Sequence, residues 1–394
     1  MLKYDIGIIG GGPIGGFVSG KIATKNFKVA VFEKNKEIGV PFNCAGLITP
    51  RVFDFLDISQ DKVVQNKIKG ANIHSPAGKI LTIGGDKVHA VVINRTIFDQ
   101  EIVKQSEKKG AEIFLNNNVL SIQKVDNHIE LKTSKNIDVK CKLIIGADGP
   151  FSRVRDRFAF SEPFEFLRGF GAELINTNLN PNFIEIFVGN NIAPGFFAWI
   201  IPTNKTGSEA RIGLCINRYD AYSPKYYLSN FLKNKKSQEF LENIKIKKYI
   251  GGIIPLGALK KTHGSNVMLV GDAAAQVKPT SGGGIYTGIS CGNHCSNVAI
   301  EALEKNIFTT QFLKKYHKLW TADIGKELFL GMKFRNIFKS LSDKQFDKYI
   351  EKFSNPKLVE IVSKYGDIDY PSKLIKPLLK RAPTLLKLLP NIIK

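Results

Sequence analysis

The sequence predicts an α/β protein in which a Rossmann-like domain is combined with an antiparallel β-sheet domain and a C-terminal helical region. Three observations indicate this fold: a glycine-rich turn directly after the first apolar segment, alternating apolar and polar residues in the middle of the chain, and helical periodicity near its end. We expect the Rossmann-like domain to comprise residues 1–164 and 256–305, the antiparallel sheet 165–255, and the helical region 306–394.

The first glycine-rich turn follows a predicted strand over residues 4–9 and precedes a predicted helix over 17–25. Gly10, Gly12 and Gly15 have the spacing G-x-G-x-x-G. In a dinucleotide-binding unit the first glycine permits a tight turn, the second lets the backbone approach a pyrophosphate, and the third allows the helix to pack closely on the strand. The helix N-terminus adds unpaired N–H groups that favour a phosphate.

An acid at the end of the second predicted strand completes this pattern. Residues 28–32 form that strand, and Glu33 follows, 18 residues after Gly15. In dinucleotide-binding units an acid at about this distance hydrogen-bonds a ribose hydroxyl. Strand, turn, helix and acid together predict a dinucleotide site, without choosing between NAD and FAD.

Two later apolar strands also end in polar turns. The strand over residues 143–146 is followed by Asp148, and the strand over 267–270 is followed by Asp272. Ligands of open α/β sheets bind at the carboxyl ends of the strands, so both acids are candidates for a cofactor site. A second glycine-rich turn, residues 282–284, then opens another predicted helix and offers backbone donors to an anion.

The order of these motifs resembles that of the FAD-dependent hydroxylase superfamily. Its three segments appear here as G-x-G-x-x-G, Asp-Gly-x-x-Ser-x-x-Arg and Gly-Asp-Ala-Ala followed by Pro-x-x-Gly-x-Gly, within roughly residues 1–300. The resemblance implies that FAD is the cofactor, that Asp272 holds the ribityl chain and that the second glycine turn lies against the flavin. It also implies an arginine near the cofactor, at Arg95. The implied cofactor-binding residues are Gly10, Gly12, Gly15, Glu33, Arg95, Asp148, Asp272, Gly282, Gly283, Gly284 and Ile285.

Two further segments resemble the archaeal-type geranylgeranyl reductases, flavoenzymes that hydrogenate prenyl double bonds of membrane lipids. Residues 41–46 read Pro-Phe-Asn-Cys-Ala-Gly, which matches Pro-x-x-Cys-x-Gly. Residues 197–202 read Phe-Ala-Trp-Ile-Ile-Pro, where the family has Tyr-x-Trp-x-Phe-Pro. The chain departs from the family again at residues 211–213, which read Arg-Ile-Gly in place of Gly-x-Gly.

This resemblance implies a reductase that saturates isoprenoid (geranylgeranyl) double bonds of membrane lipids or their precursors, by flavin hydride transfer plus protonation. Cys44 is the candidate catalytic proton donor, and Gly46, Phe197 and Trp199 are candidates for the substrate pocket. The same residue types also have plainer interpretations. A lone cysteine is usually a small buried hydrophobe, and an aromatic pocket wall and a sheet core demand the same chemistry.

The remaining cysteines predict packing more than chemistry. Cys291 and Cys295 lie four residues apart, on one face of a predicted helix. A sharper hypothesis is that Cys291 approaches Cys44 and forms a redox-sensitive pair near the flavin. The five cysteines and six histidines show no metal-ligand spacing, so we expect no metal site and no iron–sulfur cluster.

Charge and hydropathy restrict the location and the partners. The net charge is +22, yet no nucleic-acid module is evident, and no apolar stretch approaches the ~20 residues of a membrane-spanning helix. Residues 371–394 carry lysines and an arginine, no acid, and many leucines and isoleucines. Such a tail suits an anionic membrane surface. We therefore expect a cytoplasmic protein, peripheral at the inner face of the membrane.

Two other functions fit the cofactor motifs. An FAD-dependent aromatic monooxygenase or halogenase shares all three of them, and a membrane-associated electron-transfer flavoprotein would need no substrate pocket. The electron donor is also open, because no second complete dinucleotide fingerprint is evident and either NADPH or a ferredoxin would serve. The particular isoprenoid lipid and the oligomeric state are not readable from the sequence.

Overall fold

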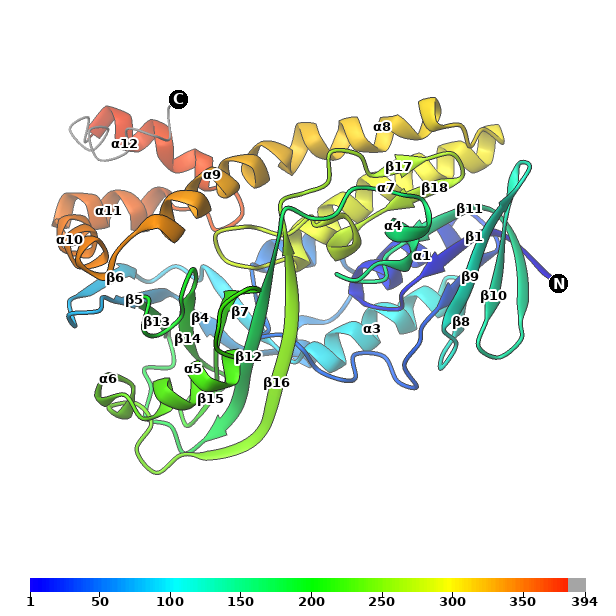
Figure 1. Ribbon diagram of the computed structural model, residues 1–394. Helices are drawn as coiled ribbons and strands as arrows, with labels where there is room; N and C mark the ends of the chain where they lie inside the picture. The colour runs from blue at the N-terminus through cyan, green and yellow to red at the C-terminus, as the bar shows by residue number, and fades with distance from the viewer. Residues whose placement is uncertain (382–394) are drawn as a thin grey trace.

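The computed structural model describes residues 1–381 and contains three β-sheets with helices packed between and around them (Figure 1). The α/β class expected from the sequence, with a Rossmann-like part, a second sheet and a helical C-terminal region, is confirmed.

The first sheet forms the Rossmann-like part. Its strand order is β17-β18-β11-β1-β2-β8, with β10 and β9 paired in turn beside β11. The bounds are β1 (Leu2–Ile9), β2 (Val29–Phe32), β8 (Ala111–Phe114), β9 (Val119–Val125), β10 (His128–Thr133), β11 (Asp138–Gly146), β17 (His263–Gly264) and β18 (Val267–Leu269).

Parallel pairing brings the carboxyl ends of four of these strands together. Ile9 of β1 pairs with Phe32 of β2 and with Gly146 of β11, and Gly146 pairs with Leu269 of β18. The turns that follow these strands therefore meet at one edge of the sheet. Strands hundreds of residues apart in the chain thus contribute to a single ligand-binding edge, as expected for an open α/β sheet.

Helices cover this sheet and carry its core. Helix α1 packs against both α3 and α7, and their apolar side chains form one buried cluster with the inner faces of β1, β2 and β11. The bounds are α1 (Pro13–Ala23), α3 (Arg95–Lys108), α4 (Arg153–Arg157), α7 (Ile285–Lys305) and the 3₁₀ turn η2 (Gly271–Ala274).

The second sheet has seven strands in the order β16-β12-β15-β14-β13-β5-β6. All its pairs are antiparallel except β13 with β5. The bounds are β5 (Gly70–His74), β6 (Ile80–Gly84), β12 (Glu165–Ile175), β13 (Phe183–Val188), β14 (Phe197–Pro202), β15 (Glu209–Asn217) and β16 (Lys245–Leu256), with α5 (Pro224–Leu232) and α6 (Lys235–Gln238) between β15 and β16.

This sheet extends beyond the 165–255 stretch expected for it. Strands β5 and β6 precede that stretch and join the sheet through the parallel pairing of β5 with β13. A small third sheet, in the order β3-β7-β4, is formed by strands that precede and follow β5 and β6 in the chain. Its elements are β3 (Leu47–Ile48), the 3₁₀ turn η1 (Pro50–Phe55), α2 (Gln60–Val63), β4 (Val64–Ile68) and β7 (Ala90–Ile93).

The C-terminal helices run from one sheet to the other (Figure 1). Helix α8 packs on α7, whereas α10 and α11 pack on β6. The bounds are α8 (Thr310–Trp320), the π-helical turn η3 (Thr321–Gly325), α9 (Lys326–Ser340), α10 (Asp343–Phe353), α11 (Pro356–Tyr365), the 3₁₀ turn η4 (Pro371–Leu374) and α12 (Ile375–Arg381). Within residues 1–381, no helix has the length and apolar character needed to cross a membrane.

The basic tail lies only partly in this region. Lys373, Lys376 and Lys380 are exposed, whereas Lys387 and Lys394 lie outside the described residues.

Candidate functional site

A cleft lies at the strand edge described above, and the first glycine turn lines one end of it. We call this the nucleotide end, because the turn is the predicted dinucleotide site. Gly10 has φ +104°, and a Cβ there would collide with the carbonyl oxygen of Ala147. A Cβ on Gly15 would collide with the carbonyl oxygen of Gly10. Both positions therefore require glycine for steric reasons.

The N-terminus of α1 faces open space. Gly12 is the N-cap residue, no side chain caps the helix, and a Cβ on Gly12 would meet nothing within 4 Å. Pro13 follows at the first helical position, where its missing N–H costs nothing. The remaining amide groups of the first turn are thus available to a phosphate, with the helix dipole favouring negative charge.

Two polar side chains lie at the same end. Glu33 accepts hydrogen bonds from the backbone N–H groups of Gly11 and Asn35, both at 2.8 Å, which hold its carboxylate beside the turn. Among residues 1–381 the buried side-chain oxygen of Asn117 has no hydrogen-bond partner, and Asn117 lines the cleft. An orphaned acceptor in the cleft wall fits a bound nucleotide that donates to it. Sequence reasoning did not identify Asn117, since no motif marks it.

Asp148 serves the local fold. Ser152 Oγ donates to one carboxylate oxygen at 2.6 Å, and the N–H of Val154 donates to the other at 3.2 Å. These bonds hold the turn between β11 and α4, which forms part of the cleft wall. Direct contact of Asp148 with a cofactor stays a prediction.

Arg95 lines the cleft away from the first glycine turn, and Asp272 lies close enough to interact with it electrostatically. The Arg95 guanidinium makes two hydrogen bonds to Asp99, at 3.0 and 2.8 Å, and interacts electrostatically with Asp272. Burial raises the pKa of Asp272 to about 6, although Arg95 opposes this rise. No hydrogen bond from residues 1–381 to the Asp272 carboxylate is found, so its oxygens are free to accept from ligand hydroxyls.

The second glycine turn lies directly against Asp272. A Cβ on Gly284 would be 3.0 Å from Asp272 Oδ1. The turn is closed by two backbone hydrogen bonds, from Gly282 N to the Lys278 carbonyl at 2.9 Å and from Lys278 N to the Gly283 carbonyl at 3.1 Å. Helix α7 then begins at Ile285 without a side-chain cap, which leaves first-turn amides available. The structure thus brings Asp272 and residues 282–285 together, as the motif order implied.

Cys44 lies in the loop after β2 and lines the same cleft. Its sulfur accepts a hydrogen bond from the N–H of Gly46 at 3.3 Å. Arg95 and Arg211 both interact electrostatically with Cys44. Burial by itself lowers the pKa of Arg95, but the carboxylate of Asp99 and the nearby Cys44 raise it by more. Arg95 therefore stays charged. The Cys44 sulfur therefore lies near two positively charged guanidinium groups.

Arg211 holds the Cys44 loop to the second sheet. This side chain is only 3% exposed, and its Nη1 donates to the carbonyl oxygens of Ala45 at 3.1 Å and Ile93 at 2.9 Å. It also pairs with Glu173 at 3.1 Å and with the Gln65 amide oxygen at 2.8 Å.

The close approach of Arg211 explains a glycine in the loop. A Cβ on Gly46 would collide with Arg211 Nη1. Arg211, which stands where the geranylgeranyl reductase pattern has a glycine, therefore has a structural role, and Gly46 leaves room for its side chain. A place for Gly46 in the substrate pocket stays a prediction.

A group of aromatic side chains lies near the second glycine turn, where Phe196 is 3.7 Å from the position of a Cβ on Gly282. Phe197 stacks on Phe196 with ring centroids 4.3 Å apart and meets the edge of Trp199 at 6.1 Å. Trp199 and Ala45 pack on the same small apolar cluster, and Trp199 also belongs with Phe196 and Ile254 to a second one. A Cβ on Gly282 would lie 3.0 Å from Ile254. Phe197 and Trp199 are both partly exposed, and their place in a substrate pocket stays a prediction.

Cys291 lies in a different environment. It is fully buried in the core around α7, and its electrostatic neighbours are Asp323 and Cys295. Cys44 and Cys291 are both free thiols, so the hypothesised redox pair is not formed in this structure. Burial raises the pKa of both Cys291 and Cys295, which fits packing. Within residues 1–381 no group of three or more metal-ligating side chains is found.

Known proteins resemble this chain over nearly its full length. Residues 3–299 match the family described as FAD binding domain. An uncharacterized protein of Methanocaldococcus jannaschii is 34% identical over 96% of this chain and 95% of its own length. The digeranylgeranylglycerophospholipid reductase of the same organism is 30% identical over 98% of this chain and 97% of its own. A solved structure, of a geranylgeranyl bacteriochlorophyll reductase-like protein from Thermoplasma acidophilum, has a TM-score of 0.85 at 24% identity and covers 100% of both chains.

Proposed function

We propose that this chain, which belongs to the FAD-binding-domain family, is an FAD-dependent reductase that saturates geranylgeranyl double bonds of isoprenoid lipids. The observation that carries the proposal is the full-length similarity to a digeranylgeranylglycerophospholipid reductase. The geometry supports it, because Cys44 lines the cleft and Phe196, which stacks on Phe197, lies near the second glycine turn.

The residues present fit FAD. The turn at Gly10 and the free amides of α1 suit the pyrophosphate, and Glu33 suits a ribose. The unpaired carboxylate of Asp272 suits the ribityl hydroxyls. The turn over residues 282–284, backed by α7, suits the polar edge of the flavin ring. Once bound and reduced, FAD supplies the hydride for the alkene.

The protein has to supply a proton and a dry, ordered site. An isolated alkene does not stabilise negative charge, so a proton must reach the neighbouring carbon as the hydride is transferred. We assign this proton to Cys44, which lines the cleft. The positive charges of Arg95 and Arg211 stabilise the sulfur anion that remains after the proton leaves. Phe197 and Trp199 exclude water and hold the prenyl chain.

The proposed reaction does not specify which isoprenoid lipid is the substrate. The chain is 34% identical to a protein without an assigned function and 30% identical to the reductase from the same organism. The proposal therefore commits to a geranylgeranyl substrate class, and a substrate panel identifies the lipid.

The electron donor and the membrane surface are further proposals. NADPH and a ferredoxin are the two donor classes we consider. Peripheral association with an anionic membrane is supported by the net charge of +22 and by the exposed Lys373, Lys376 and Lys380. A membrane-bound substrate is reached most directly by a protein that docks on the same surface.

The experiment that tests the function is an anaerobic incubation of FAD-loaded protein with dithionite and a panel of prenyl lipids. The panel contains geranylgeranyl diphosphate, a digeranylgeranylglyceryl phospholipid and a prenyl quinone. We expect mass gains in steps of two hydrogens for at least one lipid. If no lipid gains mass, and oxygen is instead consumed with an aromatic substrate in air, the chain is a monooxygenase or halogenase.

A further inference from the structure

We propose that Asp369 is a positioning residue that acts through Lys278 to fix the glycine turn at the flavin end of the cleft. Asp369 comes from the C-terminal region, beyond residue 299, where the family match ends. The inference goes beyond the reductase assignment, and it rests on that assignment only in requiring that the chain binds FAD.

Lys278 is the residue on which the glycine turn closes. Its backbone N–H and carbonyl make both hydrogen bonds of the turn, to Gly283 and from Gly282. Its side chain folds back under the same turn, since a Cβ on Gly283 would be 3.1 Å from Lys278 Cε. The position of the Lys278 side chain therefore limits where residues 282–284 lie.

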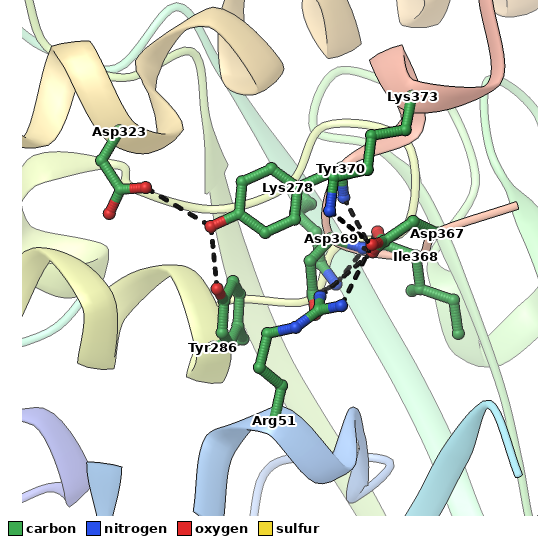
Figure 2. Close-up of polar contacts among 9 residues, drawn as sticks. All are labelled: Arg51, Lys278, Tyr286, Asp323, Asp367, Ile368, Asp369, Tyr370 and Lys373. Atoms are coloured by element: carbon green, nitrogen blue, oxygen red, sulfur yellow. Dashed lines mark hydrogen bonds and ion pairs between the residues drawn. The ribbon is translucent and has the colours of Figure 1, made fainter. Parts of the chain in front are cut away.

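A buried carboxylate holds that side chain. Lys278 is 8% exposed and Asp369 is 0% exposed, and their charged atoms are 2.7 Å apart (Figure 2). Lys278 Nζ also lies 3.4 Å from the carbonyl oxygen of Ile368, to which it donates. A buried ammonium group needs such a partner, because its charge is poorly solvated otherwise. Asp369 is the only anion that pairs with Lys278 within residues 1–381.

Arg51 anchors the same carboxylate from another side. Its Nη1 is 2.9 Å from Asp369, and its guanidinium makes two hydrogen bonds to Asp367, at 3.1 and 3.0 Å. Figure 2 shows the Arg51 guanidinium and Lys278 converging on residues 367–369. Within residues 1–381 no hydrogen bond or ion pair joins Asp367 to Lys278. Asp367 Oδ1 accepts from the N–H groups of Asp369 and Tyr370, at 3.0 and 3.1 Å, and an asparagine Oδ1 can accept the same bonds.

A tyrosine pair joins this segment to α7. The hydroxyl groups of Tyr370 and Tyr286 are 2.8 Å apart, and Tyr286 lies in the first turn of the helix that the glycine turn opens. The Tyr370 hydroxyl also donates to Asp323 at 3.4 Å (Figure 2). The segment over residues 367–370 thus contacts the glycine turn through Lys278 and the helix behind it through Tyr286. A shift of Asp369 would release the turn, and we infer that the flavin would be held less tightly.

The test measures FAD binding in the full chain, and it compares Asp369→Asn with the matched control Asp367→Asn. Both variants remove one charge from the same segment and from contact with Arg51, but only the first breaks the pair with Lys278. We expect Asp369→Asn to raise the dissociation constant for FAD by about tenfold or more and to shift the visible absorption of the bound flavin. We expect Asp367→Asn to change the FAD dissociation constant by less than about twofold.

Lys278→Met keeps the proposal testable if Asp369→Asn fails to fold. This variant leaves Asp369 paired with Arg51, so the segment stays docked, and we expect the same loss of FAD affinity and the same spectral shift. Two results overturn the proposal: a Lys278→Met or Asp369→Asn protein with wild-type FAD affinity and spectrum, or an Asp367→Asn protein as impaired as Asp369→Asn. A wild-type chain that binds no FAD would instead overturn the proposed function itself.

Discussion

At the nucleotide end of the cleft the groups proposed to bind the cofactor are mostly backbone amides from one short segment. At the flavin end, charged side chains from distant segments join the amides of the second glycine turn. Gly10 to Gly15 and Glu33 belong to one strand–helix–strand unit. Arg95, Asp272 and Cys44 come from three separate parts of the chain. The structure of the nucleotide end therefore depends on the space available to the backbone, and that of the flavin end depends on the pairing of charged side chains.

This difference predicts how each end responds to substitution. A backbone turn without room for a Cβ loses its function with one added methyl group. A cluster of paired charges loses it when one partner is removed and the other stays buried. The predictions below test this contrast, from the largest expected effect to the smallest.

Substitution of the nucleotide turn has the largest expected effect. In Gly15→Ala the new methyl group would collide with the carbonyl oxygen of Gly10, so the turn cannot close as it does now. We expect protein that purifies without FAD and does not take it up in a flavin fluorescence titration. Gly85→Ala is the control, because its Cβ would meet nothing within 4 Å. Stoichiometric FAD in Gly15→Ala would contradict the steric account.

Removal of Arg211 is the next largest change. Arg211→Ala leaves Glu173 without its buried partner and the carbonyls of Ala45 and Ile93 without a donor. We expect a loss of about 3–5 kcal/mol in the free energy of unfolding, measured by urea denaturation. Arg218→Ala, on an exposed side chain at the end of the same strand, should change it by about 0.5 kcal/mol or less. Equal losses in the two variants would show that Arg211 does not hold the loop.

Substitution of Cys44 separates chemistry from cofactor binding. We expect Cys44→Ala to bind FAD like the wild type and to lose prenyl reduction by about 100-fold or more, the range of general acid catalysis. Lipid mass gain per unit time is the measurement. Cys141→Ala, in the core of the first sheet, is the matched control and should keep its turnover. Unchanged turnover in Cys44→Ala removes this thiol from the mechanism.

The smallest expected effect is a pH dependence that arises at Asp272. Because its pKa in the folded chain is about 6, the side chain takes up a proton as the pH falls through this value. A protonated carboxyl is a poorer acceptor for ribityl hydroxyls, so FAD affinity should fall below pH 6, by at most about tenfold per unit. Titrations at pH 7.5 and about pH 5 measure it.

The same pKa has the opposite consequence for the cofactor-free fold. A carboxyl whose pKa is raised on folding binds its proton more tightly in the folded state, so its burial destabilises the fold above about pH 6 and this cost fades as the pH falls toward 4. Asp272→Asn should remove both dependences. FAD affinity in that variant that still falls with pH would assign the effect to another group.

The cofactor and the reaction class could be predicted from the sequence, and the comparisons confirm both. The glycine spacing, Glu33 and the strand before each turn are local patterns, because the backbone geometry they require is set by neighbouring residues. The site residues themselves stay predictions, although Asp272 and the 282–284 turn do lie together.

Contacts between distant residues were decided only by the tertiary structure. The pairing of β5 with β13, the hydrogen bonds of Arg211 to Ala45 and Ile93, and the Asp369–Lys278 pair each join residues more than 80 positions apart in the chain. A buried charge requires a partner, but no spacing rule says which of 35 acidic residues it will be. The sequence by itself determined the chemistry that the backbone offers the cofactor. The choice of partners for the buried arginines and for Lys278 was left to the packing of the whole chain, because ion pairs over long sequence separations leave no periodic signal.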